Sequence, residues 1–273
     1  MHAALGGQIA AMPLSFDVED DHLAKMTPPE PSLRQSLLRD YRHVSGPISS
    51  GSVYRDIRAA WPYYEENYRQ PLAHLLKEGR IVELGSGPGG LLAWLRHKGF
   101  SAIQGIDASQ GQVDFANAHL GAGTVQFGDA VAFLRDHPRT YDLVIAKALL
   151  EHLPKDALLP LVHAMAGSLR ENGIALIDVP NMDWVAASHE RYLDLTHEVG
   201  FTRESLATLL RLAFDECEIA GSRIAQPTGS QRALRPLLLW LWTRALYILG
   251  EGANDTLFAS RSLIAVARRP RRD

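Results

Sequence analysis

Short apolar segments alternate regularly with helix-like segments over residues 80–179, and this alternation constrains the fold more than any other feature of the sequence. Each apolar segment has the length of a buried strand, about four to seven residues. Strands that alternate with helices indicate an α/β fold with a doubly wound, mainly parallel sheet. We expect strands at Arg80–Leu84, Ala102–Ile106, Val125–Phe127, Tyr141–Ala146 and Gly173–Val179, and helices at Gly89–Lys98, Gly111–His119, Ala130–Asp136 and Lys155–Leu169.

The segments on either side of this alternation are expected to differ in order. Residues 1–50 are polar and contain several prolines, which predicts a partly disordered leader with a short helix. Residues 51–273 are then the folded domain, with a helical insertion at about 220–261. We place the leader's helix at Ser32–His43 and expect further helices at Tyr54–Leu76 and Arg203–Leu212 and further strands at Asp215–Ile219 and Ser262–Ala267.

Charge and cysteine content narrow the class of protein. The net charge is -3, which gives no reason to expect a nucleic-acid partner. Cys217 is the only cysteine, so the chain cannot form an internal disulfide, which suits a reducing compartment such as the cytoplasm. The N-terminus shows no secretory signal pattern.

One apolar stretch, Ala233–Leu249, lies inside the insertion. Arg235, Pro236 and Arg244 interrupt it, and it falls short of the roughly 20 apolar residues that span a membrane. Three alternatives stay open. The stretch is a helix packed against the domain, an interface of a homodimer, or a helix in peripheral contact with the inner membrane surface, with its arginines at the headgroups.

A glycine-rich run, IVELGSGPGG, follows the first expected strand and opens the first helix. Gly85, Gly87 and Gly89 stand at alternate positions, where glycine permits tight turns and close approach of a ligand to the backbone. The free N–H groups of the next helix point into the same crevice, at the carboxyl ends of the strands. The run therefore predicts a cofactor site.

The glycines alone fit two cofactors, because Gly85, Gly87 and Gly90 also match the dinucleotide pattern G-x-G-x-x-G. Three acidic residues distinguish them. Glu83 can anchor the amino end of a zwitterionic ligand but would repel a pyrophosphate. Asp107, at the end of the second strand, can accept from both ribose hydroxyls, and Asp129 can accept from an adenine amine.

Taken together, these motifs resemble those of the class I S-adenosylmethionine-dependent methyltransferases. The resemblance implies a Rossmann-like fold with a seven-stranded sheet, whose antiparallel last strand Ser262–Ala267 can supply. It also implies that the glycine turn passes the methionine moiety, that Asp107 binds the ribose, and that Asp129 with Ala130 holds the adenine. The full set of cofactor-binding candidates is Glu83, Gly85, Ser86, Gly87, Gly89, Asp107, Ala108, Asp129 and Ala130.

The first candidate for acceptor chemistry is His152, in the run LEHLP after the fourth strand. This run resembles the equivalent segment of small-molecule O-methyltransferases, including those of ubiquinone biosynthesis, in which a Glu-His pair with a preceding acid can hold magnesium. Lys147 stands where that acid would be, so no metal site is expected. His152 is then a catalytic candidate or a hydrogen-bonded residue beside the crevice.

The second candidate is His197, in a segment after the fifth strand that reads DLTHEVGFTRESL. It resembles methyltransferases encoded with bacterial polysaccharide and glycolipid pathways. Thr202 can cap the following helix, but capping does not account for Asp194 or His197. Histidine is the commonest general base. We therefore expect His197 to act as a base, with Asp194 orienting it or binding a sugar hydroxyl; the alternative is that both only stabilise the loop.

The sequence favours a cytoplasmic O-methyltransferase that acts on a sugar hydroxyl of a glycan precursor or glycosylated metabolite. A methyltransferase of a quinone, phenol or amine is the main alternative. Two other classes compete with it. An NAD-dependent oxidoreductase is disfavoured by Glu83 and Asp129, and a cofactor-binding module without turnover is disfavoured by the acceptor loop.

Overall fold

The computed structural model describes residue 36 and residues 57–225, 227–248 and 259–271. All of them belong to one of the two units of the chain, Leu33–Asp273. Of the expected leader and its helix at Ser32–His43, only residue 36 is described, and it is helical; the rest of that segment lies outside the described residues.

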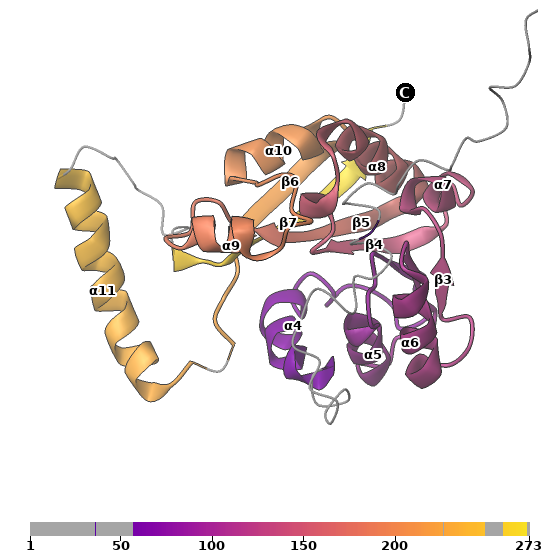
Figure 1. Cartoon of the computed structure of the whole chain (residues 1–273), viewed down its shortest axis with the longest axis horizontal. Coiled ribbons are helices and arrows are strands. Elements are labelled where there is room, and N and C mark those ends of the chain that lie inside the picture. The colour runs from indigo at the N-terminus through magenta and orange to yellow at the C-terminus, as the bar shows by residue number, and fades with distance from the viewer. Residues whose placement is uncertain (1–35, 37–56, 226, 249–258, 272–273) are drawn as a thin grey trace, which may run out of the picture. The chain divides into compact units, whose positions relative to one another are not determined.

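A seven-stranded sheet forms the centre of the domain, in the order β3-β2-β1-β4-β5-β7-β6 (Figure 1). Neighbouring strands from β3 to β5 run parallel, and β7 runs antiparallel to both β5 and β6. This confirms the mainly parallel, Rossmann-like sheet with an antiparallel last strand. The strands are β1 (Ile81–Leu84), β2 (Ile103–Asp107), β3 (Val125–Phe127), β4 (Tyr141–Lys147), β5 (Leu169–Pro180), β6 (Phe214–Gly221) and β7 (Ser262–Pro270).

Helices cover both faces of the sheet (Figure 1). Successive side chains of a strand point to opposite faces, so the central strands contribute to two separate cores. Leu143 of β4 packs with α4, α5 and α6 in one core, and the next residue, Val144, packs with α7, α8 and α10 in the other. The helices are α4 (Trp61–Tyr68), α5 (Gly90–His97), α6 (Gln110–Leu120), α7 (Ala130–Arg135), α8 (Lys155–Ser168) and α10 (Arg203–Arg211).

The strand order places a crevice at a definite position. From β1 the chain moves outward to β2 and β3 on one side, and β4 and β5 then lie on the other side of β1. Ligands of open α/β sheets bind at such a reversal, outside the carboxyl ends of the strands. Both the glycine turn after β1 and the LEHLP segment after β4 lie at this edge.

Several elements differ from the sequence predictions. The helix expected over Tyr54–Leu76 is interrupted within the described residues: residues 57–59 are helical, residue 60 is a turn, and α4 then spans Trp61–Tyr68. Strand β5 begins earlier than expected because Leu169 already pairs with Tyr141 of β4. The register then shifts, and Asn172, between the two paired stretches, has a positive φ of 64°. Two short helices were not predicted, η1 (Leu150–His152) and α9 (Ala187–Leu193).

The apolar stretch of the insertion forms helix α11 (Gly229–Ile248). Most of its large apolar side chains are exposed, so they do not form a core with the domain in the described part of the chain. None of the described helices is long and apolar enough to cross a membrane.

Candidate functional site

The glycine turn after β1 has the backbone conformation that its sequence predicts. Gly85, Gly87 and Gly89 all have positive φ, at 63°, 51° and 78°. The Gly87 amide donates to Asp107 Oδ2 at 2.8 Å, and the Ser109 amide donates to Asp107 Oδ1 at the same distance. Asp107 at the end of β2 therefore fixes the turn and keeps a carboxylate at the rim of the crevice.

The space around the turn differs from one residue to the next. A Cβ at Gly85 would lie 2.9 Å from Leu149 Cδ1, whereas a Cβ at Gly87 would have no atom of the described residues within 4 Å. Ser86 is buried, and its side chain packs against Gly105 of β2. A ligand would therefore approach the turn at Gly87 and meet Ser86 through its backbone.

Glu83, in β1, is buried next to this turn, with 3% of its surface exposed. Its Oε2 has no hydrogen-bond partner among the described residues. Burial raises the pKa of Glu83 to about 8, although the nearby Lys147 charge opposes the rise. A buried carboxylate oxygen without a partner is costly, and a ligand ammonium would satisfy it. The residues present therefore fit the amino end of S-adenosylmethionine.

The remaining cofactor candidates lie at the ends of β2 and β3. Ala108 is exposed and directly follows Asp107. Asp129 caps helix α7, because its Oδ1 accepts from the Ala132 amide at 2.9 Å. Ala130 is the first residue of that helix. Helix capping through Oδ1 is a structural role that explains why an aspartate stands at this position. The carboxylate of Asp129 is exposed and can accept further hydrogen bonds.

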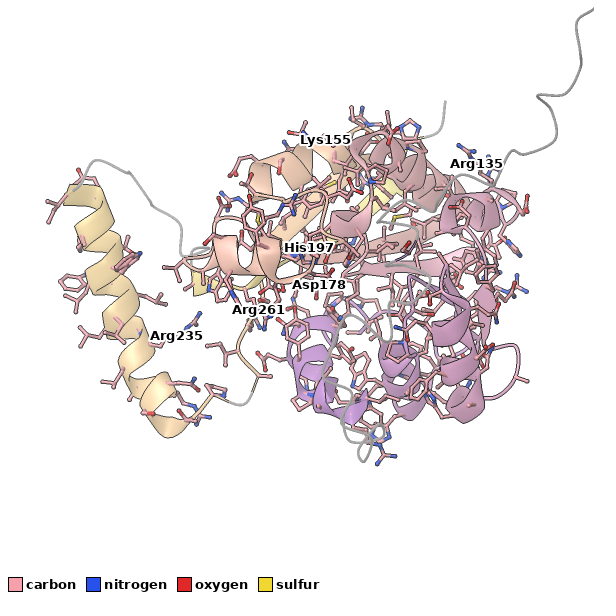
Figure 2. All side chains as sticks on the ribbon, in the orientation of Figure 1. Arg135, Lys155, Asp178, His197, Arg235 and Arg261 are labelled. Carbon is pink, nitrogen blue, oxygen red and sulfur yellow. The ribbon has the colours of Figure 1, made fainter. Side chains whose placement is uncertain are left out.

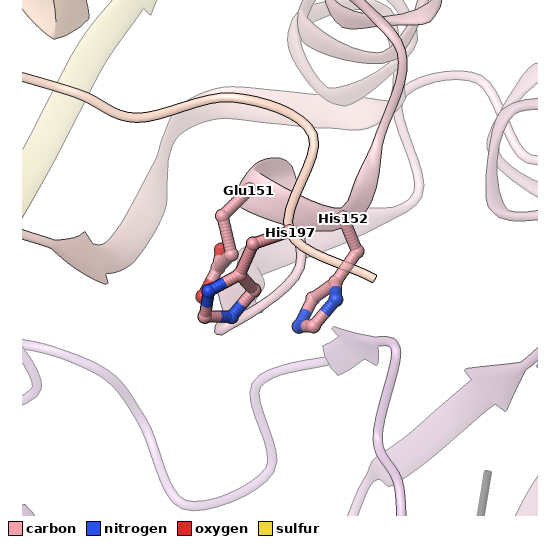
Figure 3. Close-up of side chains that lie close together, drawn as sticks. All are labelled: Glu151, His152 and His197. Carbon is pink, nitrogen blue, oxygen red and sulfur yellow. The ribbon is translucent and has the colours of Figure 1, made fainter. Parts of the chain in front are cut away.

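The acceptor candidates from two distant segments lie together (Figure 3). The ring centroids of His152 in η1 and His197 in the loop after α9 are 4.7 Å apart. Two hydrogen bonds join the segments, because the Glu198 and Val199 amides donate to the Glu151 carbonyl oxygen at 2.7 and 3.1 Å. These backbone hydrogen bonds hold the two segments side by side.

Each histidine is held through Nδ1. Thr196 Oγ1 donates to Asp194 Oδ1 at 2.7 Å, so it accepts from His152 Nδ1, 2.7 Å away. His197 Nδ1 lies 3.1 Å from the Glu190 carbonyl oxygen, which can only accept. In the neutral rings both protons therefore sit on Nδ1 and both lone pairs on Nε2. Two bases with fixed tautomers are the result.

Asp194 contacts both histidine segments. Its carboxylate leads through Thr196 to His152, and its carbonyl oxygen accepts from the His197 amide at 3.2 Å. The ring of His197 instead contacts the backbone of Glu190, whose carboxylate binds Arg261 through two hydrogen bonds of 2.9 and 3.1 Å.

Sequence reasoning missed a cluster of buried charges behind the histidines. Asp178, near the end of β5, accepts from Tyr63 Oη at 2.8 Å and from Tyr68 of α4. Burial raises the pKa of Asp178, opposed by the positive charge of Lys147. Asp178 and His197 come from different elements (Figure 2). An acid at the end of an apolar strand, the signal that identified Asp107, could also have identified Asp178.

Glu151 belongs to the same surroundings. Only 2% of its surface is exposed, and its Oε2 has no hydrogen-bond partner among the described residues. Burial raises its pKa to about 8, and the Asp178 charge raises it further while Lys147 lowers it. Lys147 is thus the positive charge that Glu83, Glu151 and Asp178 share.

Glu151, His152 and His197 form a group that could hold a metal ion, since one ligand atom from each lies within 4.8 Å of the others. Magnesium prefers oxygen ligands in near-octahedral geometry, whereas this group offers two imidazole nitrogens and one carboxylate. The Lys147 charge also acts on Glu151. The group therefore does not fit the magnesium of the ubiquinone-type enzymes.

Comparison with known proteins agrees with this geometry. The family described as the methyltransferase domain matches residues 59–213, more than half of the chain. No curated protein matches. Solved structures share the fold, among them an S-adenosylmethionine-dependent methyltransferase from Archaeoglobus fulgidus, with a TM-score of 0.57, 19% identity, and coverage of 80% of this chain and 100% of that one.

Two further similar structures have lower sequence identity. One, from Thermotoga maritima, is described as a possible histamine N-methyltransferase, with a TM-score of 0.54, 14% identity and coverage of 85% and 97%. The other is phosphoethanolamine N-methyltransferase 2 from Haemonchus contortus, with a TM-score of 0.53, 15% identity and coverage of 86% and 61%. At these identities the likeness concerns the fold alone. The matched family, the sheet order and the glycine turn with its acids agree, and the chain belongs to the class I S-adenosylmethionine-dependent methyltransferases.

Proposed function

We propose that this methyltransferase transfers the methyl group to a hydroxyl oxygen, and that the hydroxyl belongs to a sugar of a glycan precursor or glycosylated metabolite in the cytoplasm. The observation that carries the proposal is the pair of histidines, His152 and His197, with both Nδ1 atoms engaged. An alcohol must lose its proton as it attacks, and a neutral histidine with its lone pair on Nε2 can take that proton.

On the cofactor side, each candidate has a role that its position supports. Glu83 would bind the ammonium group of the cofactor, Gly87 would pass its methionine chain, and Asp107 would accept from the ribose hydroxyls. Asp129 and Ala130 would contact the adenine at the start of α7. S-adenosylmethionine supplies an electrophilic methyl group on a positively charged sulfur.

On the acceptor side, His197 is assigned as the general base. It removes the hydroxyl proton on Nε2 as the new O–CH₃ bond forms and the S–CH₃ bond breaks, so that the sulfonium charge is neutralised as the imidazolium forms. Alignment of the two reactants contributes as well, and good alignment can supply about 7–11 kcal/mol. His152, held by Thr196 and Asp194, is a second base beside it and orients the hydroxyl.

The choice of a sugar rests on the acceptor loop, whose D-x-T-H…F-T…S-L pattern resembles enzymes of polysaccharide and glycolipid pathways. A phenol, quinol or amine is the alternative acceptor class. A phenol ionises more readily than an alcohol, so it would depend less on a base. The two classes therefore differ in how much turnover should fall when the histidine is removed.

A panel of acceptors tests the proposal directly. Release of S-adenosylhomocysteine is measured with free and nucleotide-linked sugars, catechols, quinols and primary amines, and the methylated atom is identified by mass spectrometry. We expect turnover with a sugar and an O-methyl product. Turnover confined to amines, with an N-methyl product, would refute the proposal.

Substitution of the base gives the second test, with the sugar that the panel identifies. His197→Ala should lower kcat by about 10²–10⁴-fold and leave the affinity for S-adenosylhomocysteine nearly unchanged, because His197 lies on the acceptor side. His163→Ala, at an exposed position of α8, is the matched control and should behave as the parent protein. Normal turnover of the His197 variant would show that the assignment is wrong.

A further inference from the structure

Helix α11 carries a row of leucines along one side. Leu234, Leu237, Leu238 and Leu241 follow one another at the spacing i, i+3, i+4, i+7, which places them on a single face of a helix. Between 49% and 60% of each side chain is exposed. We call these four residues the leucine stripe.

The other side of the helix is less exposed. Arg235, Leu239 and Thr243 are spaced four residues apart, and all three are half-buried, whereas the leucines of the stripe are exposed. An Arg235 guanidinium nitrogen donates to the Ala259 carbonyl oxygen at 3.4 Å. Within the stripe, Leu234 and Leu238 also line an open pocket with Val185 and Ala259, whereas Leu237 and Leu241 do not line it. Exposed apolar surfaces that are large and contiguous mark interaction sites.

Aromatic residues flank the stripe. Trp240 and Trp242 fall on opposite sides of it at 100° per residue, and both are exposed. Arg244 lies over the Trp240 ring, with its guanidinium carbon 5.8 Å from the ring centroid. Tryptophan is enriched at the boundary between lipid chains and water, because its side chain combines an apolar ring with a polar N–H group.

All charged residues of α11 are positive. The helix contains Arg232, Arg235 and Arg244 and no acidic residue, whereas the whole chain has a net charge of -3. A second copy of this helix would offer the arginines no acidic partner, which gives no charge complementarity for a dimer through α11. A negatively charged surface with an apolar interior would match both the arginines and the leucines.

We propose that α11 is a peripheral membrane-binding helix that lies in the surface of an anionic bilayer, with the leucine stripe among the lipid chains. The tryptophans lie at the level of the headgroups and the arginines contact lipid phosphates. The helix lies along the surface, consistent with the finding that no described helix can span a membrane. This inference stands on α11 alone and does not depend on the identity of the methyl acceptor.

The test is flotation of the full-length protein with vesicles of phosphatidylcholine alone or mixed with phosphatidylglycerol. We expect binding to the mixed vesicles, a blue shift of tryptophan emission, and weaker binding at high salt because the Debye length shortens. Failure to bind the mixed vesicles would overturn the proposal, and so would equal binding to both vesicle types.

Matched variants locate the binding surface. Leu237→Ser with Leu241→Ser should lower vesicle affinity by at least about tenfold, since apolar burial is lost, while Leu76→Ser with Leu212→Ser, exposed leucines outside α11, should not change it. Arg232→Gln and Arg244→Gln should each lower affinity about fivefold. Unchanged binding of the stripe variant overturns the proposal. A parent protein that dimerises in solution and ignores vesicles, with a monomeric stripe variant, would assign the stripe to a second copy instead.

Discussion

The two halves of the crevice are built by different means. The cofactor half, at the ends of β1, β2 and β3, uses a glycine turn whose amide is fixed by a carboxylate on the neighbouring strand. The acceptor half uses side chains from η1 and from an irregular loop, joined by backbone hydrogen bonds to Glu151. Regular elements thus position the half that we assign to the cofactor, and irregular segments position the half that we assign to the acceptor.

The largest effect on cofactor affinity is expected where the cofactor half leaves open space. Gly87→Val should weaken S-adenosylhomocysteine binding by about 100-fold, because the added side chain enters the region a ligand needs. Gly123→Val is a close control, since Gly123 also has a positive φ, of 77° against 51°, and open space around its Cβ. Calorimetry measures both. Equal losses would mean that backbone strain alone is responsible and that no ligand lies at Gly87.

The next effect concerns the charge state of Glu83, whose pKa burial raises to about 8. A ligand ammonium binds the ionised carboxylate, so affinity for S-adenosylhomocysteine should rise about tenfold per pH unit below the pKa and level off above it. Affinity rises with pH because Glu83, with its raised pKa, is mostly protonated at pH 7 and must lose its proton before it can bind the ammonium group. Calorimetry over about pH 6–9, a range that includes the raised pKa of Glu83, checks this. Glu83→Gln should bind more weakly with a flat profile, and a flat profile in the parent protein would contradict the assignment.

A smaller effect is expected in the acceptor half. Thr196→Val removes the hydroxyl between His152 and Asp194 and should lower kcat about fivefold, the value of one ordinary hydrogen bond. Because Thr196 positions a base, the variant should also shift the acidic limb of the pH–rate profile while cofactor affinity stays unchanged. Thr208→Val, where the hydroxyl donates to the Glu204 carbonyl oxygen within the same helix, is the control. An unaltered pH profile would leave Thr196 with a purely structural role.

The smallest effect tests the nature of the acceptor half. If His152 and His197 act as bases, dialysis against a chelator should leave turnover with the identified acceptor unchanged. Loss of turnover that returns with a divalent transition metal would make Glu151, His152 and His197 ligands. The acceptor half would then be a metal site, whereas the cofactor half binds its ligand through the protein alone.

The cofactor half could be predicted from the sequence because local rules determine it. A strand followed by Gly85, Gly87 and Gly89 requires a tight turn with positive φ, and Asp107 must stand at the same edge because parallel strands end together. The core could be predicted for the same reason, as alternate residues of β4 such as Leu143 and Val144 face opposite layers.

The acceptor half could be predicted only as a list of residues. That Asp194 reaches His152 through Thr196 depends on the loop conformation, which no periodicity encodes. Helix α9 was missed because its seven residues, ASHERYL, show no apolar repeat. The exposure of α11 also contradicts the ordinary expectation that an apolar helix is buried, because that pattern is the same for a core and for a lipid surface.

The bridge between Asn181 and Phe201 has a consequence for how this chain can be re-engineered. With the Met182 amide donating to the Phe201 carbonyl oxygen at 2.8 Å, the two ends of the intervening segment are fastened to each other beside the sheet. Residues 182–200 can therefore lengthen, shorten or be exchanged as a cassette without altering where the chain leaves and rejoins the scaffold. A designer who grafts a donor loop between these two points can thereby test whether the segment selects the acceptor, because the glycine turn and its acids lie outside the exchanged residues.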